Sequence, residues 1–147
     1  MMALSISSGN LLIILQNELS GIGYSMTTRK SHKQRGATFE SQLRDWFRTN
    51  GYSAERLART GARDEGDIVI SEDFLGSVGI IEAKAPGASN RIDLSGWTKE
   101  AQLEATHYAE ARGLQRSEVT SAVIIKARGK SIADAYLVFR LGDIFGE

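Results

Sequence analysis

The sequence predicts an α/β fold in which two helices and five short strands follow one another in the order α-β-β-β-α-β-β. Three observations predict this fold class. Apolar residues recur at helical spacing in two segments, short apolar runs lie between and after these segments, and glycine-containing turns separate the runs. The 147 residues, 41% hydrophobic and 24% charged, suit one compact domain with a core of ordinary size.

The two helices are expected where one helical face is apolar. Residues 36–50 form the first, with Gly51 as its stop and a face made of Phe39, Leu43, Trp46 and Phe47. Residues 97–112 form the second, with Gly113 at its end and a face made of Trp97, Ala101, Ala105 and Tyr108. The predicted strands are residues 53–60, 67–70, 78–85, 119–126 and 135–140.

The first 25 residues differ from the rest because they are almost free of charge, and they precede a second plausible start at Met26. We therefore divide the chain into residues 1–25, an arm or extension of unknown role, and residues 26–147, the main domain. No stretch reaches the roughly 18 apolar residues of a membrane span. The apolar run 11–15 lacks the basic leader and the cleavage site of a signal peptide. We expect a cytoplasmic protein without a membrane partner.

The chain contains no cysteine. This absence excludes disulfides, thiolate zinc sites and cysteine nucleophiles. Any metal must be bound by carboxylates or by the two histidines, His32 and His107.

Charge is distributed unevenly along a chain whose net charge is zero. Residues 26–63 contain nine Lys or Arg and three acids, a net charge of +6, whereas residues 64–147 contain nine bases and fourteen acids, a net charge of −5. This asymmetry suggests a basic surface for a polyanion beside an acidic region that holds a cation. Taken alone, the charge pattern favours the simpler interpretation, in which the basic residues solvate a helix and a loop.

Four charged residues lie where the predicted helix and strands direct their side chains toward apolar surroundings. Glu40 lies on the Leu43 side of the first helix, and Asp67 opens an apolar strand. Glu82 and Lys84 share one face of the next strand, since side chains alternate. Burying three carboxylates costs several kcal/mol per ion, and a divalent cation bound by the acids offsets that cost.

Each of these residues also has an ordinary structural explanation. The Glu82–Lys84 pair suits a solvated strand face, and Asp67 after a glycine suits a turn. Glu40 has a basic neighbour at i+4, Arg44. The conjunction favours a site, because the helix Glu, the Asp at a strand start and the Glu-x-Lys strand occur in this order at compact spacing.

Three segments carry a resemblance to a known family: GATFESQLRDWFRTNGYSAERLARTGARDEGDIVI, GIIEAKA and WTKEAQLEATHYAEARG. They resemble the core of PD-(D/E)XK nucleases, in particular the archaeal-type Holliday junction resolvases that also occur in phages. The resemblance covers residues 29–140 and implies a restriction-endonuclease-like core, with a central mixed β-sheet flanked by helices. The motif's proline is absent, and Gly66 precedes the motif aspartate.

The resemblance assigns roles to the acidic residues. Glu40 corresponds to the acid of the first helix, Asp67 to the motif aspartate, and Glu82 and Lys84 to the D/E-x-K pair. Asp67 and Glu82 are expected to bind one or two Mg²⁺ ions, for which Mn²⁺ substitutes, with the backbone carbonyl of Ala83 and waters completing the shell. Glu40 is expected to complete a second metal position or to orient a water.

Two further catalytic roles follow from the resemblance. Lys84 would orient or deprotonate the attacking water and offset negative charge near the phosphate. Gln102 on the second helix would contribute a hydrogen bond to the site, a role for which Glu104 and Tyr108 on the same helix are alternatives.

The basic segment and the loop before Asp67 are expected to contact DNA phosphates, which positions DNA without reading its sequence. The loop supplies the family's basic residue and hydroxyl as Arg59 and Thr60. The full set of expected DNA-binding residues is Arg29, Lys30, Lys33, Arg35, Arg56, Arg59, Thr60 and Arg63.

These residues lead to one expected function and two alternatives. The expected function is a metal-dependent endonuclease that acts as a homodimer on branched double-stranded DNA, most specifically a four-way junction, in the cytoplasm of a bacterium, an archaeon or a phage-infected cell. Another DNA nuclease of the same superfamily, of restriction or repair type, would use the same four residues. A non-catalytic nucleic-acid-binding module is disfavoured, because it has no need for converging carboxylates near phosphates.

Overall fold

The computed structural model describes the backbone of residues 24–59, 62–88 and 90–146 and the side chains of residues 31–59, 62–71, 74–88 and 90–146. The chain divides into two units, residues 1–34 and 35–147, and the whole sheet belongs to the second. Most of the predicted arm, residues 1–23, lies outside the described residues, and the predicted boundary at Met26 stays a prediction.

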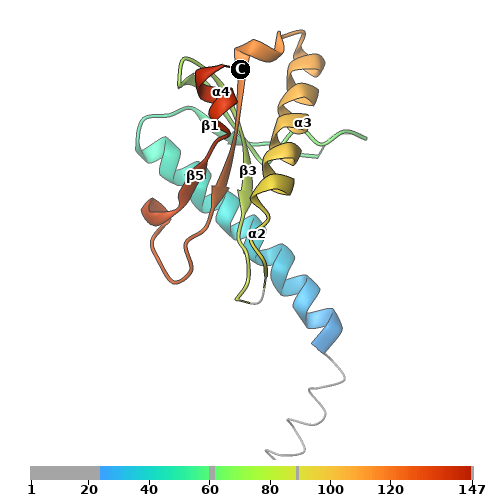
Figure 1. Cartoon of the computed structure of the whole chain (residues 1–147). Coiled ribbons are helices and arrows are strands. Elements are labelled where there is room, and N and C mark those ends of the chain that lie inside the picture. Colours follow the sequence, from blue (N-terminus) through green and yellow to red (C-terminus); the bar gives the residue numbers. More distant parts are fainter. Residues whose placement is uncertain (1–23, 60–61, 89, 147) are drawn as a thin grey trace, which may run out of the picture. The chain divides into compact units, whose positions relative to one another are not determined.

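The described elements follow the predicted order, with short additions (Figure 1). The longer helices are α2 (Tyr24–Thr49) and α3 (Leu94–Arg112). The strands are β1 (Ala54–Arg56), β2 (Ile68–Phe74), β3 (Ser77–Lys84), β4 (Val119–Ile125) and β5 (Tyr136–Val138). The additions are the 3-10 turns η1 (Arg116–Glu118) and η2 (Ile132–Asp134) and the short helix α4 (Leu141–Phe145).

Several predicted boundaries differ from the structure, among them that of β2, which runs to Phe74 and not to residue 70. The first helix begins at Tyr24 and not at residue 36, because neither proline nor glycine interrupts residues 24–35 and Gly36 is accommodated inside the helix. The first strand covers only Ala54–Arg56 of the predicted 53–60, since it is an edge strand that pairs with β2 alone. In the described part of the chain, none of the helices combines the length and apolar character that a membrane span requires.

The strands form one mixed sheet in the order β1-β2-β3-β4-β5. Strands β1, β2 and β3 form an antiparallel meander, and β5 pairs antiparallel with β4. Strands β3 and β4 are parallel, and α3 makes the crossover between them. The predicted α/β class, a mixed sheet flanked by helices, is therefore confirmed.

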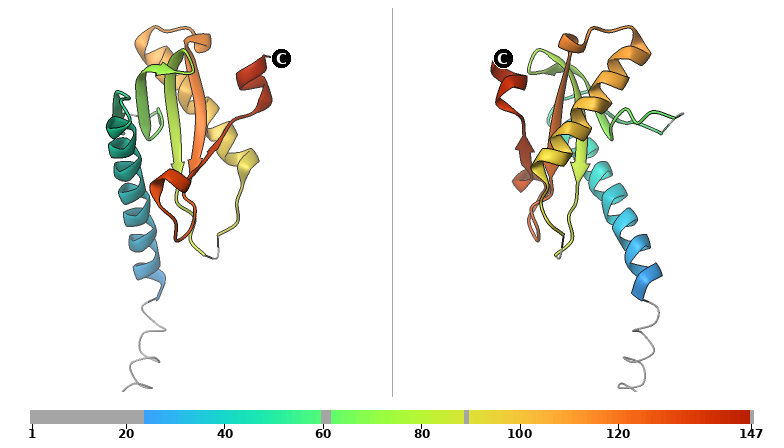
Figure 2. Two further views of the ribbon diagram at one scale, coloured as in Figure 1. Left: turned by 90° about the vertical axis from the view of Figure 1, so that its left-hand side faces the viewer. Right: turned by 45° about the vertical axis from the view of Figure 1, so that its right-hand side comes forward.

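Each face of the sheet is covered by one helix (Figure 2). On one face, Phe39 and Leu43 of α2 pack with Ile81 of β3, and on the other, Ala105 of α3 packs with Ile80. Side chains alternate along β3, so Ile81 points to α2 while Ile80 and Glu82 share the α3 side. The register of β3 thereby decides that its one buried acid meets α3.

Gly66, which stands in place of the motif's proline, has a backbone conformation that proline cannot adopt. Its φ is +98°, whereas the proline ring fixes φ near −65°. A Cβ at this position would lie 2.7 Å from Cγ2 of Ile80. Glycine is therefore required both by the left-handed turn and by the close approach to β3.

We expect Gly66→Ala to destabilise the fold more than Gly51→Ala, which serves as its matched control. Both positions have positive φ, which costs an alanine about 1–2 kcal/mol. Only at Gly66 does the new methyl group clash, and overpacking adds about 1–3 kcal/mol. Urea unfolding of the two variants measures the difference, and equal losses would contradict the close approach to Ile80.

Candidate active site

The pairing of β2 with β3 brings Asp67 and Glu82 together. The register joins Ile68 to Ile81, and the backbone N–H of Asp67, just before β2, donates to the carbonyl of Ile81 over 3.0 Å. The backbone N–H of Ala83 donates to Oδ2 of Asp67 over 2.8 Å. The motif aspartate is thus fixed against the strand that carries the Glu-x-Lys pair.

Lys84 lies between two carboxylates. Its Nζ is 2.5 Å from Oε1 of Glu82 and 2.6 Å from Oε2 of Glu100 on α3. The side chain of Glu82 is 9% exposed and that of Lys84 is 19% exposed, so water screens their attraction only weakly. Burial lowers the pKa of Lys84, but its hydrogen bonds to Glu100 and Glu82 outweigh burial and raise this pKa above its ordinary value. The lysine is an ammonium here.

Helix α3 adds two glutamates to this group, and the sequence analysis did not single out Glu100. Glu104, considered only as an alternative to Gln102, is buried at 3% exposure. One carboxylate oxygen each from Glu82, Glu100 and Glu104 lie within 4.8 Å of one another. The i, i+4 spacing of Glu100 and Glu104, with Glu104 beside Ala105 of the apolar face, is the signal that could have found them.

The carboxylates are crowded, and their pKa values reflect it. Burial, followed by the charge of Glu82, raises the pKa of Asp67 to about 8, although the hydrogen bond from the Ala83 N–H lowers it and Glu40 raises it further. Burial and then the charge of Glu82 also raise the pKa of Glu104. More negative charge is gathered here than one lysine can neutralise.

Glu40 reaches this region from α2 but already has a partner. Its Oε2 accepts hydrogen bonds from the guanidinium of Arg56 on β1. Its charge still acts on Asp67, which places Glu40 at the edge of the site. Arg56, an expected DNA-binding residue, is therefore engaged with an acid of the site.

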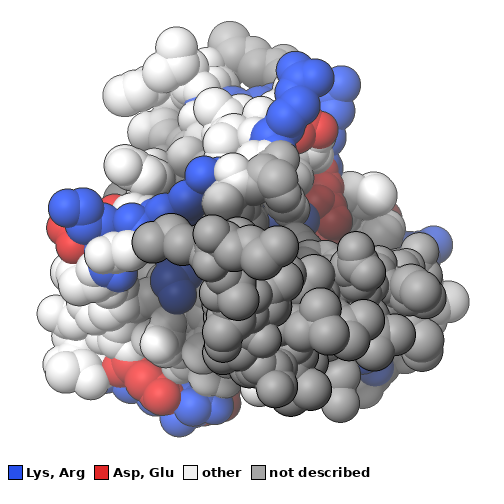
Figure 3. All heavy atoms as spheres, turned by 90° about the horizontal axis from the view of Figure 1, so that it is seen from below, with Lys and Arg blue, Asp and Glu red and all other residues white. Residues whose placement is uncertain are grey.

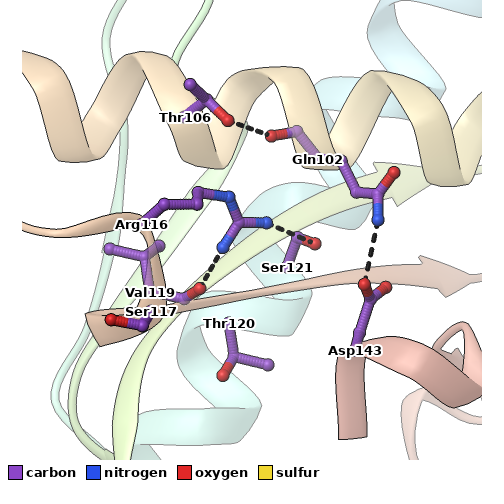
Figure 4. A pocket seen from close by; sticks show the side chains of 8 residues that line it. All are labelled: Gln102, Thr106, Arg116, Ser117, Val119, Thr120, Ser121 and Asp143. Atoms are coloured by element: carbon purple, nitrogen blue, oxygen red, sulfur yellow. Dashed lines mark hydrogen bonds between the residues drawn. The ribbon is translucent and has the colours of Figure 1, made fainter. Parts of the chain in front are cut away.

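Gln102 lies outside this group of charged residues (Figure 4). Its amide donates to Oδ1 of Asp143 on α4 over 2.9 Å. The two residues line a pocket with Arg116, and neither Asp67 nor Glu82 lines that pocket. The structure thus turns Glu104, and not Gln102, toward Glu82.

Tyr108 and His107 have structural contacts. Tyr108 is buried in the core cluster of Val69 and Ile80, with the guanidinium of Arg112 3.6 Å from the centre of its ring. Nδ1 of His107 lies 2.8 Å from the carbonyl oxygen of Asp64. Both side chains therefore have structural partners in the described part of the chain.

The loop arginines are bound to acids. Arg59 pairs with Asp64 at 2.8 Å and Arg63 with Glu110 at 2.6 Å, and both arginine side chains are exposed. Figure 3 shows the same feature on one face, where Lys and Arg lie beside Asp and Glu at several places. Exposed ion pairs contribute little free energy, so these arginines can exchange an acid for a phosphate.

The remaining expected DNA-binding residues are described in part. Lys33 and Arg35 are exposed on α2. The side chains of Arg29 and Lys30, and all of Thr60, lie outside the described residues.

Comparisons with known proteins give similarity at the level of structure. No protein-family model matches the chain, and it matches no curated protein. Among solved structures it is similar to Hjc of Archaeoglobus fulgidus, a Holliday junction resolvase from an archaeal hyperthermophile. The two chains are 18% identical, with a TM-score of 0.46, over 70% of this chain and 75% of that chain.

We expect Asp67 to make the metal-free protein less stable as the pH rises. Because the pKa of Asp67 is raised from 3.8 to about 8 on folding, the folded state binds more protons than the unfolded state between these values. The free energy of unfolding therefore falls as the pH rises through this window. Across this pH window, the Asp67→Asn variant should lose less stability than the unmodified protein.

Thermal unfolding in a chelator at a series of pH values measures this difference. Asp45→Asn is the matched control, because Asp45 is 62% exposed and pairs only with Arg44 among the described residues. Identical pH slopes for Asp67→Asn and the unmodified protein would contradict the crowding of Asp67 and Glu82.

Proposed function

We propose that the chain is a metal-dependent DNA endonuclease that hydrolyses phosphodiester bonds and resolves four-way junctions. One observation carries the proposal: Asp67 is held against β3 beside Glu82, and Lys84 contacts Glu82 at 2.5 Å. This brings together the aspartate and the Glu-x-Lys pair that the sequence places 15 and 17 residues apart.

The donor set fits a hard divalent cation. Asp67 and Glu82 offer carboxylate oxygens, and the backbone carbonyl of Ala83 lies on the same strand. A divalent cation would also relieve the repulsion that raises the pKa of Asp67. When bound, such an ion polarises the phosphodiester and lowers the pKa of a bound water. We assign this role to Mg²⁺, with Mn²⁺ as a substitute.

Lys84 acts as a charged group. Because Glu82 and Glu100 both contact its ammonium, it orients the attacking water by donating a hydrogen bond and offsets charge that develops on the phosphate. Glu40 lies at the edge of the site, where it forms an ion pair with Arg56 and its charge raises the pKa of Asp67. Gln102 can contribute a hydrogen bond to the site only if its amide leaves Asp143 of α4, to which it donates a hydrogen bond.

The basic residues are assigned to phosphate contacts. Lys33 and Arg35 are exposed, and Arg59 and Arg63 exchange acid partners for phosphates. Contacts to phosphates carry no base sequence, which favours a substrate recognised by shape.

A homodimer suits a junction, because two-fold symmetry places one site at each of two opposed strands. Apolar side chains that could form such an interface are exposed near the C-terminus. Tyr136 and Leu137 are exposed on the edge strand β5, and Leu141 and Phe145 on α4. An edge strand with exposed apolar side chains is a common site of pairing with a second chain.

We expect Asp67→Asn and Glu82→Gln each to abolish Mg²⁺-dependent cleavage, because each removes a charged ligand. Lys84→Ala should lower the rate about 10²–10⁴-fold, the range of a proton-transfer or charge-stabilising group. DNA affinity measured in Ca²⁺ should be retained. Single-turnover cleavage of a labelled junction measures the rates.

Matched controls are Asp134→Asn and Lys130→Ala, which change the same charges at exposed positions. Full activity in Asp67→Asn or Glu82→Gln would refute the assignment. Loss of activity in the controls as well would show that net charge, and not the site, decides the rate.

We expect the protein to be a dimer that cuts a four-way junction faster than linear duplex. Light scattering measures the oligomeric state. A cruciform plasmid reports the chemistry, since paired cuts in one complex linearise it and independent nicks first relax it. A monomer that cuts duplex as fast as a junction would contradict the resolvase proposal and favour a nuclease of restriction or repair type.

A further inference from the structure

A second group of carboxylates lies on the α3 side of Glu82, and Asp67 does not belong to it. Glu82 of β3 and Glu100 and Glu104 of α3 each present one oxygen, and these oxygens lie within 4.8 Å of one another. Glu104 contributes from the interior, at 3% exposure, whereas the side chain of Glu100 is 47% exposed. The group therefore has a buried end and an open end.

The buried end holds an unusual atom. Oε2 of Glu104 is buried and, among the described residues, has no hydrogen-bond donor. Buried carboxylate oxygens in folded proteins are almost always hydrogen-bonded or bound to a cation. A cation bound beside Glu82 and Glu100 would satisfy this oxygen.

We propose that Glu82, Glu100 and Glu104 bind a divalent cation at a position separate from that of Asp67, with Glu82 shared between the two positions. The inference deepens the proposed function and rests on it in one respect, namely that Glu82 also serves the Asp67 position. The chemical class of the ligand is a hard divalent cation such as Mg²⁺ or Mn²⁺.

The spacing of the oxygens suits such a cation. Ligand oxygens lie about 2.1 Å from Mg²⁺ and about 2.4 Å from Ca²⁺, so opposite ligands are about 4.2 Å and about 4.8 Å apart. The three oxygens lie within 4.8 Å of one another, so no pair exceeds the span that the larger ion bridges. Glu100 is exposed, so its side chain can move to close the group around the smaller ion.

The charge of the group also suits one divalent ion. Three carboxylates and the Lys84 ammonium, −3 and +1, leave two negative charges. Lys84 contacts Oε1 of Glu82 and Oε2 of Glu100, so each of these carboxylates keeps a second oxygen. The ammonium and the cation can be bound by the same glutamates. Lys84 does not contact Oε2 of Glu104, which has no hydrogen-bond partner among the described residues.

Mn²⁺ binding to the full chain without DNA tests the proposal. Electron paramagnetic resonance of free Mn²⁺ and titration calorimetry give the number of ions and their affinities. We expect two ions per chain for the unmodified protein. Glu104→Gln and Glu100→Gln should each weaken one of the two by at least about tenfold, the lower bound seen when an outer partner of a metal ligand is lost.

Glu110→Gln is the matched control, because Glu110 lies on the same helix, is exposed and pairs with Arg63. It should bind both ions as the unmodified protein does. Glu100→Gln changes an exposed side chain, so it tests the site even if the buried Glu104→Gln variant does not fold. One ion per chain, or unchanged binding in Glu100→Gln, would overturn the proposal.

Asp67→Asn separates this inference from the nuclease proposal. It should remove the other ion and leave the position of Glu82, Glu100 and Glu104 bound. Two Mn²⁺ sites in a protein that cleaves no DNA would uphold the second position and refute the nuclease. Cleavage that depends on Asp67, with a single Mn²⁺ per chain, would uphold the nuclease and refute the second position.

Discussion

The hydrogen bond from the Ala83 N–H to the Asp67 carboxylate is the constraint on which the site depends. It holds Asp67, the residue just before β2, against β3 and so places the Asp67 carboxylate beside Glu82. The approach requires the backbone before β2 to lie close to β3, which only a glycine at position 66 permits. The close pairing that builds the sheet therefore also gathers like charges, and the rest of the site compensates for that repulsion.

Compensation comes from both faces of the sheet. Lys84 pairs with both Glu82 and Glu100 on the α3 side, and Arg56 binds Glu40, which comes from α2. These ion pairs still leave Asp67 and Glu104 with raised pKa values, because burial acts on both and neither is paired with a base among the described residues. Perturbed pKa values cluster at functional sites, and this is one ground for the cation binding that we propose here.

The sequence predicts the elements of the sheet well because alternation and helical spacing report local burial. It also predicts that Glu82 and Lys84 share a face, a consequence of strand geometry alone. It could not predict that Gln102 turns to Asp143, since that contact depends on α4, which the apolar pattern did not indicate. The i, i+4 spacing of Glu100 and Glu104 marks them as neighbours, but it does not say which strand they meet, because the partner of Glu100, Lys84, lies across the parallel crossover. Tertiary packing, and not local pattern, decides which polar residue of α3 meets β3.

The graded exposure of the glutamates on α3 gives the site a direction. Glu104 lies at the closed end against the core, Glu82 and Lys84 are largely covered, and Glu100 meets solvent. If these glutamates bind a cation as proposed, Glu100 marks the end of the group that is open to solvent. Glu100 and Lys84 would then form the rim of the site, and Glu100 would affect how long an ion stays bound as well as how tightly it binds.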